Sequence, residues 1–185
     1  MTLAFVHHDL AGARHAARFI ALAVVVWAAG SVSLLAQPTP LVYSGVVTHV
    51  VDGDTVWVRV TPSNETLKVR IEGIDAPEGC QAGGTSSRAA LLHRVKGQNV
   101  TLIANPGRSH DDYGRLLARL QLEGEDVGRW MVANGHAWSY RYRKNPGPYG
   151  AEQSRAVAGG LGLFSDPVAE NPRDFRKRYG SCYLR

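Results

Sequence analysis

The stretch from Val50 to Glu78 constrains the fold most, because two acidic clusters flank two runs of alternating residues. The clusters are Asp52-Gly53-Asp54-Thr55 and Asp75-Ala76-Pro77-Glu78. Acidic groups bracketing a short repeat of apolar and polar side chains predict a local sheet with charge gathered at one end.

The runs at 55–60 and 67–71 alternate with period two, and Pro-Ser-Asn-Glu between them supplies turn residues, which is typical of a β-hairpin. A hairpin returns the chain to the end from which it started. We therefore expect Asp75 to lie near Asp54, with Arg70 on the returning strand.

Each acidic cluster alone also has a structural interpretation, since Asp-Gly is common in hairpin turns and Ala-Pro-Glu can open a helix with proline at its first position. Carboxylates that converge across a sheet repel each other unless a cation or a proton lies between them. Hard cations such as calcium prefer oxygen ligands. Taken together, the two clusters predict a metal site.

The rest of the chain supplies further candidate elements. Three more strands are expected at 43–51, 99–104 and 116–122, with Gly45 as a bulge, and helices are expected from Ser86 or Ser87 to Gly97, at 126–134 and at 151–158. The tail from Phe164 to Arg185 contains prolines and is expected to pack as an extended segment. This order predicts an α+β, mainly β fold, namely a five-stranded oligonucleotide-binding (OB-fold) barrel with three helices.

The first residues have the layout of a secretory signal peptide. Arg14 and Arg18 precede an apolar run at 19–30 that continues to Ala36. Cleavage is expected after Ala36, with Ala28-Ala29-Gly30 as the alternative site. The run also approaches the length of a membrane span, so an uncleaved anchor is the alternative. The expected organisation is a signal peptide at 1–36, an OB-fold domain at 37–168 and a basic C-terminal tail at 169–185 packed on that domain.

Composition favours an ordinary globular protein with an anionic partner. Hydrophobic residues make up 44% of the chain and charged residues 20%, which argues against disorder. The 21 Lys and Arg residues outnumber the 16 Asp and Glu residues, for a net charge of +5. An excess of positive charge suits a polyanion such as a nucleic acid.

Cys80 and Cys182 are the two cysteines of the chain. A protein exported to an oxidising compartment tends to pair its cysteines, and this pair would tie the tail to the loop that contains Glu78. Two free buried thiols are the alternative. The spacing does not resemble that of a zinc site.

A third cluster, Asp111-Asp112-Tyr113-Gly114-Arg115, opens the strand expected at 116–122. It places a second arginine at a strand end, in addition to Arg70. The guanidinium group has a planar fork that binds phosphate oxygens in pairs and stays charged at any working pH, so two arginines can hold one phosphate. For either arginine alone, a surface salt bridge is the alternative.

Three motifs in this order resemble those of staphylococcal nuclease (thermonuclease) and its homologues. They are Val-Val-Asp-Gly-Asp-Thr-Val at 50–56, Arg-Ile-Glu-Gly-Ile-Asp-Ala-Pro-Glu at 70–78 and Asp-Tyr-Gly-Arg at 112–115. The resemblance covers about 43–164. It implies a five-stranded OB-fold barrel with three helices, as the elements themselves predict.

The resemblance also implies calcium-dependent hydrolysis of phosphodiester bonds in DNA and RNA. Its implied metal ligands are the carboxylates of Asp54 and Asp75 and the backbone carbonyl of Ala76, with Asp52 close to the metal in its second shell. Oxygen ligands alone separate calcium poorly from magnesium or manganese, so the choice of calcium comes from the family.

The remaining implied roles concern the substrate. In the family, the arginines that match Arg70 and Arg115 bind the scissile phosphate, and the glutamate that matches Glu78 is assigned as the base that activates water. Nothing in this chemistry needs a covalent nucleophile.

Three tyrosines are candidates for substrate binding. Tyr113 lies beside Arg115 in the matching motif, and Tyr140 and Tyr142 follow the helix expected at 126–134, although one of these two could instead belong to the core. Stacking of bases on aromatic rings would favour single strands without sequence preference.

The expected protein is a monomeric nuclease of the periplasm or the medium, which meets a membrane only if the N-terminal segment stays uncleaved. The alternative function is a non-catalytic nucleic-acid-binding module on the same fold. Such modules typically lose the carboxylates, and this chain retains Asp54, Asp75 and Glu78.

Overall fold

The computed structural model describes residues 39–141 and 145–182. The chain divides into two units, Met1–Ala36 and Gln37–Arg185, and everything described below belongs to the second. The expected signal peptide at 1–36 therefore lies outside the described residues. Within those residues, no helix combines the length and the apolar character needed to cross a membrane.

The second unit contains strands, helices and two short 3-10 turns, which follow one another along the chain. The strands are β1 (Leu41–Val50), β2 (Thr55–Thr61), β3 (Thr66–Ile71), β4 (Ile74–Asp75), β5 (Asn99–Ala104), β6 (Leu116–Leu122), β7 (Glu125–Asp126) and β8 (Trp138–Ser139). The helices are α1 (Gly84–Val95), α2 (Val127–Ala133), α3 (Gly150–Ala158) and α4 (Pro172–Tyr179), and the 3-10 turns are η1 (Pro106–Arg108) and η2 (Gly162–Ser165).

Five of these strands close into a barrel. The hydrogen-bonded order is β3-β2-β1-β5-β6, and β3 also pairs with β6, which joins the two ends. The closing pair is parallel, with Val69 opposite Leu116, whereas the other barrel pairs are antiparallel. Closure leaves no open sheet edge among these strands. The predicted five-stranded OB-fold barrel is confirmed.

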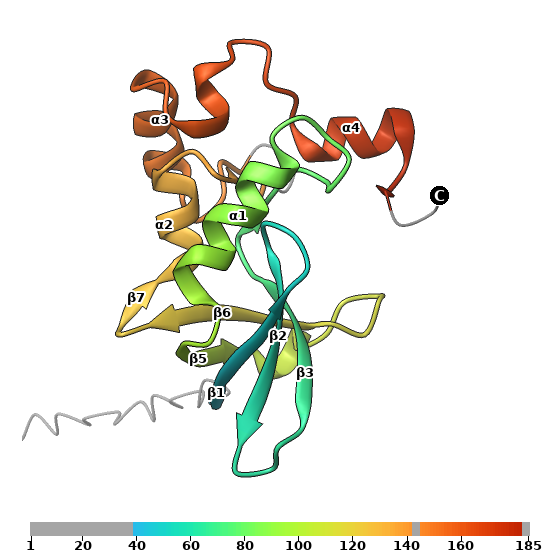
Figure 1. Ribbon diagram of the computed structural model, residues 1–185, viewed down its shortest axis with the longest axis vertical. Coiled ribbons are helices and arrows are strands. Elements are labelled where there is room, and N and C mark those ends of the chain that lie inside the picture. Colours follow the sequence, from blue (N-terminus) through green and yellow to red (C-terminus); the bar gives the residue numbers. More distant parts are fainter. Residues whose placement is uncertain (1–38, 142–144, 183–185) are drawn as a thin grey trace, which may run out of the picture. The chain divides into compact units, whose positions relative to one another are not determined.

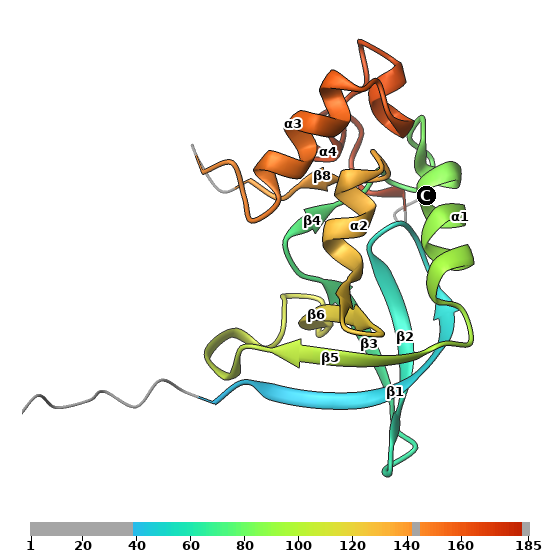
Figure 2. The ribbon, with the colours of Figure 1, turned by 90° about the vertical axis from the view of Figure 1, so that its left-hand side faces the viewer.

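Buried hydrophobic residues alternate along the barrel strands, as the period of two predicts, except in β1, where the shift in register between Val47 and His49 leaves Val47 and Val50 both buried. The strand residues among the largest fully buried side chains are Val47, Val50, Val56, Val58, Val69, Ile71, Ile74, Leu102 and Leu120. Leu91 and Val95 of α1 and Met131 of α2 complete this core, so the two helices cap the barrel. Both ribbon views show the helices toward one end of the barrel, and Figure 2 shows the short strands β4 and β8 among them (Figure 1, Figure 2).

Helix α4 corrects the sequence prediction, which had three helices and an extended tail. Asn171 caps its first turn by accepting a hydrogen bond from the Arg173 backbone N–H at 3.0 Å, and Pro172 occupies the first helical position. An Asn-Pro pair is a strong helix start, because proline lacks the N–H that this position leaves unused. The last turn carries Arg176, Lys177 and Arg178.

The bulge expected at Gly45 is also corrected. The register between β1 and β2 shifts between Val47 and His49, three residues further along the strand. Gly45 instead lies where β1 and β2 approach each other closely, because a Cβ atom there would sit 2.4 Å from the Arg59 carbonyl oxygen. The glycine therefore permits close strand contact in place of an irregular pairing.

We expect His136 to make stability depend on pH. Burial lowers the pKa of His136 below its ordinary value of 6.5. The unfolded chain then binds more protons near pH 6 than the folded one, so the free energy of unfolding falls as pH drops through about 6.5 and levels off below the folded-state pKa.

Chemical denaturation of His136→Gln and wild type at pH 8 and pH 5.5 checks this. The His136→Gln protein should lose less stability between the two pH values than wild type. His93→Gln, which changes an exposed histidine of α1, is the matched control and should follow wild type. Identical pH profiles for wild type and His136→Gln would contradict the assignment.

Candidate active site

Asp54 and Asp75 converge at one end of the barrel, joined by Arg70. Asp54 directly precedes β2 and Asp75 ends β4, while Arg70 lies on β3 opposite Thr55. Arg70 Nη1 lies 3.1 Å from Asp54 Oδ2, and Arg70 Nη2 lies 3.2 Å from Asp75 Oδ1. The structure thus brings together the residues that the hairpin argument placed side by side.

The turn at 52–54 holds Asp54 in a fixed position. Asp52 Oδ1 accepts a hydrogen bond from the Asp54 backbone N–H at 3.0 Å, and Asp54 Oδ2 accepts one from the Ala76 backbone N–H at 2.9 Å. A Cβ atom at Gly53 would lie 1.9 Å from the Ser87 hydroxyl oxygen, so only glycine lets this turn pack against α1. Asp52 therefore shapes the turn that presents the Asp54 carboxylate.

Burial dominates the protonation of both carboxylates. Desolvation raises the pKa of Asp54 to about 6, although the positive charge of Arg70 opposes the shift. Burial also raises the pKa of Asp75, against the hydrogen bond from Arg176 and the charge of Arg70. Shielded carboxylates of this kind are stabilised by nearby positive charge.

Arg176 of α4 is a residue that sequence reasoning missed. Its Nη2 donates to Asp75 Oδ2 at 3.0 Å, and its Nη1 donates to Glu78 Oε1 at 2.9 Å. Burial lowers the pKa of this guanidinium, but the hydrogen bonds and charges of Asp75 and Glu78 outweigh burial and raise it above its ordinary value. Glu78, the predicted base, and Asp75 therefore accept hydrogen bonds from the same guanidinium group, that of Arg176.

Arg115 lies at the start of β6 and is oriented by Asp111. Its Nε donates to Asp111 Oδ2 at 2.8 Å, and its Nη1 donates to the Thr55 hydroxyl at 3.2 Å. Burial acts to raise the pKa of Asp111, but hydrogen bonds from the Arg115 backbone and side chain outweigh it, so the pKa is lowered. Thr55 also donates to Asp54 Oδ1 at 3.0 Å, which links Arg115 to the carboxylates.

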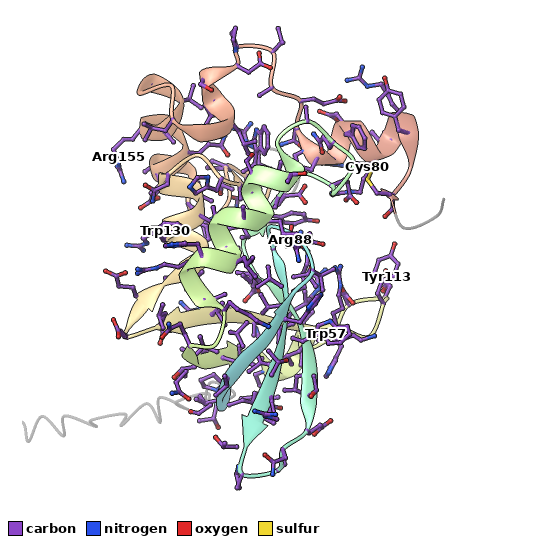
Figure 3. The ribbon with its side chains drawn as sticks, viewed as in Figure 1. Trp57, Cys80, Arg88, Tyr113, Trp130 and Arg155 are labelled. Carbon is purple, nitrogen blue, oxygen red and sulfur yellow. A yellow bond between two sulfur atoms is a disulfide. The ribbon has the colours of Figure 1, made fainter. Side chains whose placement is uncertain are left out.

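Two of the three predicted substrate tyrosines can be placed. Tyr113 is 84% exposed, and Figure 3 shows it at the tip of the loop that leads into β6. Tyr140 is exposed and lines a cleft of about 310 Å³, which also reaches Asp75, Arg141 and Arg173. This cleft lies between the end of β8 and the start of α4. Tyr142 lies outside the described residues.

The loop after β4 is joined to the C-terminal segment by a disulfide. Cys80 and Cys182 are bonded, with 5.8 Å between their Cα atoms and a separation of 102 positions in the sequence (Figure 3). The pair therefore lies two residues beyond Glu78 on one side and close to the end of α4 on the other.

The donor set at Asp54 and Asp75 fits a hard cation such as calcium. Both donors are shielded carboxylates, and calcium takes carboxylate, carbonyl and water oxygens in irregular geometry. Among the described residues, no three His, Cys, Asp or Glu side chains gather closely enough to make a metal site by themselves. A cation here would need backbone carbonyl or water oxygens in addition, and the Ala76 backbone adjoins Asp54.

Local sequence signals existed for only some of the residues that the prediction missed. The Asn171-Pro172 pair marks the start of α4 and could have revealed that helix. Thr55 belongs to the first acidic cluster, and its hydroxyl bridges Asp54 and Arg115. Nothing local identifies Arg176, because its partner Asp75 is 101 residues away in the sequence.

The fold and this site define a class of protein: an OB-fold barrel that gathers carboxylates and arginines at one end, beside an aromatic and basic cleft. The sequence model of the family described as Staphylococcal nuclease homologue matches residues 68–166, more than half of the chain. The chain therefore belongs to the staphylococcal nuclease homologue family, which confirms the resemblance and makes the protein a nuclease of that family.

Individual relatives agree with this assignment. The chain is 35% identical over 164 residues to a micrococcal nuclease of Shigella flexneri, covering 81% of this chain and 90% of that protein. It is 36% identical over 132 residues to an uncharacterised endonuclease of Haemophilus influenzae, covering 71% of this chain and 72% of that protein. An uncharacterised endonuclease of Escherichia coli O157:H7 is 35% identical over 127 residues, or 67% of this chain and 80% of that one.

We expect the two arginines to differ in their contribution to stability. Arg70→Ala leaves two buried carboxylates without a shared cation and should lower the free energy of unfolding by about 3 kcal/mol or more. Arg115→Ala breaks a pair at the barrel rim and should cost about 1 kcal/mol or less.

Urea denaturation of both variants at pH 7.5 without divalent cations measures this difference. Because the charge of Arg70 lowers the pKa of Asp54 and of Asp75, its removal raises both pKa values, and proton uptake by either carboxylate is part of the loss that the experiment measures. Equal losses for the two variants would show that Arg70 does not stabilise Asp54 and Asp75 in the way the ion pairs indicate.

Proposed function

We propose that the protein is an exported, calcium-dependent nuclease that hydrolyses phosphodiester bonds in DNA and RNA and prefers single strands. The observation that carries the proposal is the convergence of Asp54, Arg70 and Asp75, with Glu78 and Arg115 within one hydrogen-bonded network around them. The family assignment supports the reaction, and the disulfide supports export to an oxidising compartment.

Asp54 and Asp75, with the backbone carbonyl of Ala76, would hold calcium, which when bound polarises a phosphoryl oxygen. These residues suit the role because their charge is already shielded from water. Asp52 supports them from the turn, through its hydrogen bond to the Asp54 backbone.

Arg115 is well prepared to bind a phosphate. A guanidinium has five N–H donors, and in the described part of the chain Arg115 commits its Nε and one donor of Nη1, while its Nη2 lies 2.8 Å from Asp111 Oδ2. One N–H on each terminal nitrogen is left for phosphate oxygens. Arg70 supplies the second guanidinium, and the pair stabilises the charge that gathers on the phosphate in the transition state.

Glu78 is the base in this scheme, and it accepts a proton from the attacking water. Tyr113 and Tyr140 provide aromatic surfaces on which unpaired bases can stack. Stacking of this kind needs bases that are free of a duplex, which is the reason for the preference for single strands.

Calcium binding is the first test. Isothermal titration of the metal-free wild type in the presence of a nucleoside diphosphate should show one calcium site, and Asp54→Asn and Asp75→Asn should each weaken it by about 100-fold or more, because each removes a charged ligand. Chelation of calcium should stop degradation of single-stranded DNA by wild type.

Two outcomes contradict the proposal. Unchanged calcium affinity in both variants would remove these carboxylates from the site. Retention of DNA on wild type without any shortening, at saturating calcium, would instead support a nucleic-acid-binding module.

The second test concerns Glu78. Glu78→Gln keeps size and hydrogen bonding but removes the proton acceptor, so kcat should fall by about 100-fold or more while KM changes little. Single-turnover cleavage of a short single-stranded oligonucleotide, at saturating calcium and well below the melting temperature, measures the chemical step. A chemical step within a few-fold of wild type would exclude Glu78 as the base.

A further inference from the structure

The C-terminal segment at 170–182 contacts the site. This segment lies beyond the part of the chain that the family model matches, which ends at residue 166. Arg176 reaches both oxygens of Asp75, with its Nη2 3.2 Å from Oδ1 and 3.0 Å from Oδ2. Its Nη1 lies 2.9 Å from Glu78 Oε1. One guanidinium therefore spans a candidate metal ligand and the candidate base.

The same segment supplies both side-chain partners of the Glu78 carboxylate within the described residues. Arg176 donates to Oε1, and the Ser181 hydroxyl lies at a longer 3.4 Å from Oε2. The Glu78 side chain is only 12% exposed, so these contacts are shielded from solvent. Without them, a glutamate on a loop has several side-chain conformations of similar energy.

The backbone around Glu78 is tied to the same segment. The Glu78 N–H donates to Gln81 Oε1 at 3.1 Å, and Gln81 Nε2 donates to the Glu170 carbonyl at 2.7 Å. The disulfide between Cys80 and Cys182 joins the two sides covalently. The loop at 77–82 is thus fastened at its side chains and at its main chain.

We propose that Arg176 is a positioning residue for the hydrolysis: it holds the carboxylates of Glu78 and Asp75 in the orientation that the reaction needs. The proposal rests on the proposed function for its effect on turnover. A group that holds a catalytic or ligating carboxylate typically contributes 10- to 100-fold to activity, because it fixes the geometry in advance of the reaction.

The pattern of contacts fits positioning better than blocking. Arg176 binds Glu78 through Oε1, which leaves Oε2, with its long contact to Ser181, able to accept a proton from water. Among the described residues, Asp75 Oδ1 accepts hydrogen bonds from Arg70 and Arg176, whereas Asp75 Oδ2 accepts from Arg176. A carboxylate oxygen has two lone pairs, so Oδ2 retains one for a cation.

The experiment compares R176Q with R178Q in the full chain. R178Q is the matched control, because Arg178 lies on the same helix but pairs with the Glu170 side chain and not with Asp75 or Glu78, and its loss leaves the Glu170 carbonyl in place for Gln81. At saturating calcium, R176Q should lower kcat on a single-stranded oligonucleotide by about ten-fold or more, with KM within about three-fold of wild type. R178Q should match wild type in both values.

R176K gives the rescue. Lysine keeps the positive charge but lacks the planar fork that spans two carboxylates, so its kcat should lie between those of R176Q and wild type. A kcat for R176Q equal to or above that of wild type, with calcium bound more tightly by titration, would overturn the proposal and identify Arg176 as a competitor of the metal. An equal loss in R178Q would also overturn it, since the effect would then belong to the helix as a whole.

Amide hydrogen exchange tests the positioning without any turnover. In the metal-free protein, exchange of the peptide that covers 77–82 should be about ten-fold faster in R176Q than in wild type, and R178Q should leave it unchanged. Unchanged exchange in R176Q overturns the inference whether or not the wild type cleaves DNA. If wild type fails to cleave while exchange responds as expected, the proposed function is wrong, but the inference that Arg176 holds Glu78 and Asp75 in place stands.

Discussion

Two carboxylates that are almost fully shielded from water, Asp54 and Asp75, impose the main energetic constraint on this structure. Burying an ion costs several kcal/mol unless a partner of opposite charge is close and well oriented. Arg70 is placed to meet that need by the pairing of β3 with β2, and the parallel contact of β3 with β6 completes the barrel beside it. Barrel closure and charge compensation therefore depend on the same strand.

Arg70 and Arg115 differ in the groups to which they donate hydrogen bonds. Arg70 donates to the Ile71 and Ile74 carbonyls as well as to the carboxylates, so much of its hydrogen bonding is internal to the fold. Arg115 is held on one side by Asp111 and keeps donors for another group. Although both carry the same charge, the contacts of Arg70 suit it chiefly to holding the carboxylates together. The remaining donors of Arg115 suit it to binding a phosphate.

The sequence was informative where the structure is local. The period of two predicted the hairpin, and the return of the chain placed Asp54, Arg70 and Asp75 together, because a hairpin fixes which ends meet. The prolines of the tail predict an extended segment, whereas α4 forms because Asn171 caps its first turn and Pro172 suits the first helical position. Arg176 could not be predicted from any pattern, since its contact with Asp75 depends on how two distant segments pack and not on the spacing of residues.

Helix α4 follows the barrel strands in the sequence, and this order has a consequence for how the site is assembled. The barrel strands and all the acidic residues of the site are synthesised before Arg176, and the Cys182 that fastens the segment comes later still. A disulfide also persists only where the surroundings are oxidising. The barrel can therefore be complete before Glu78 gains its partner Arg176, so the site is assembled after the barrel that carries it.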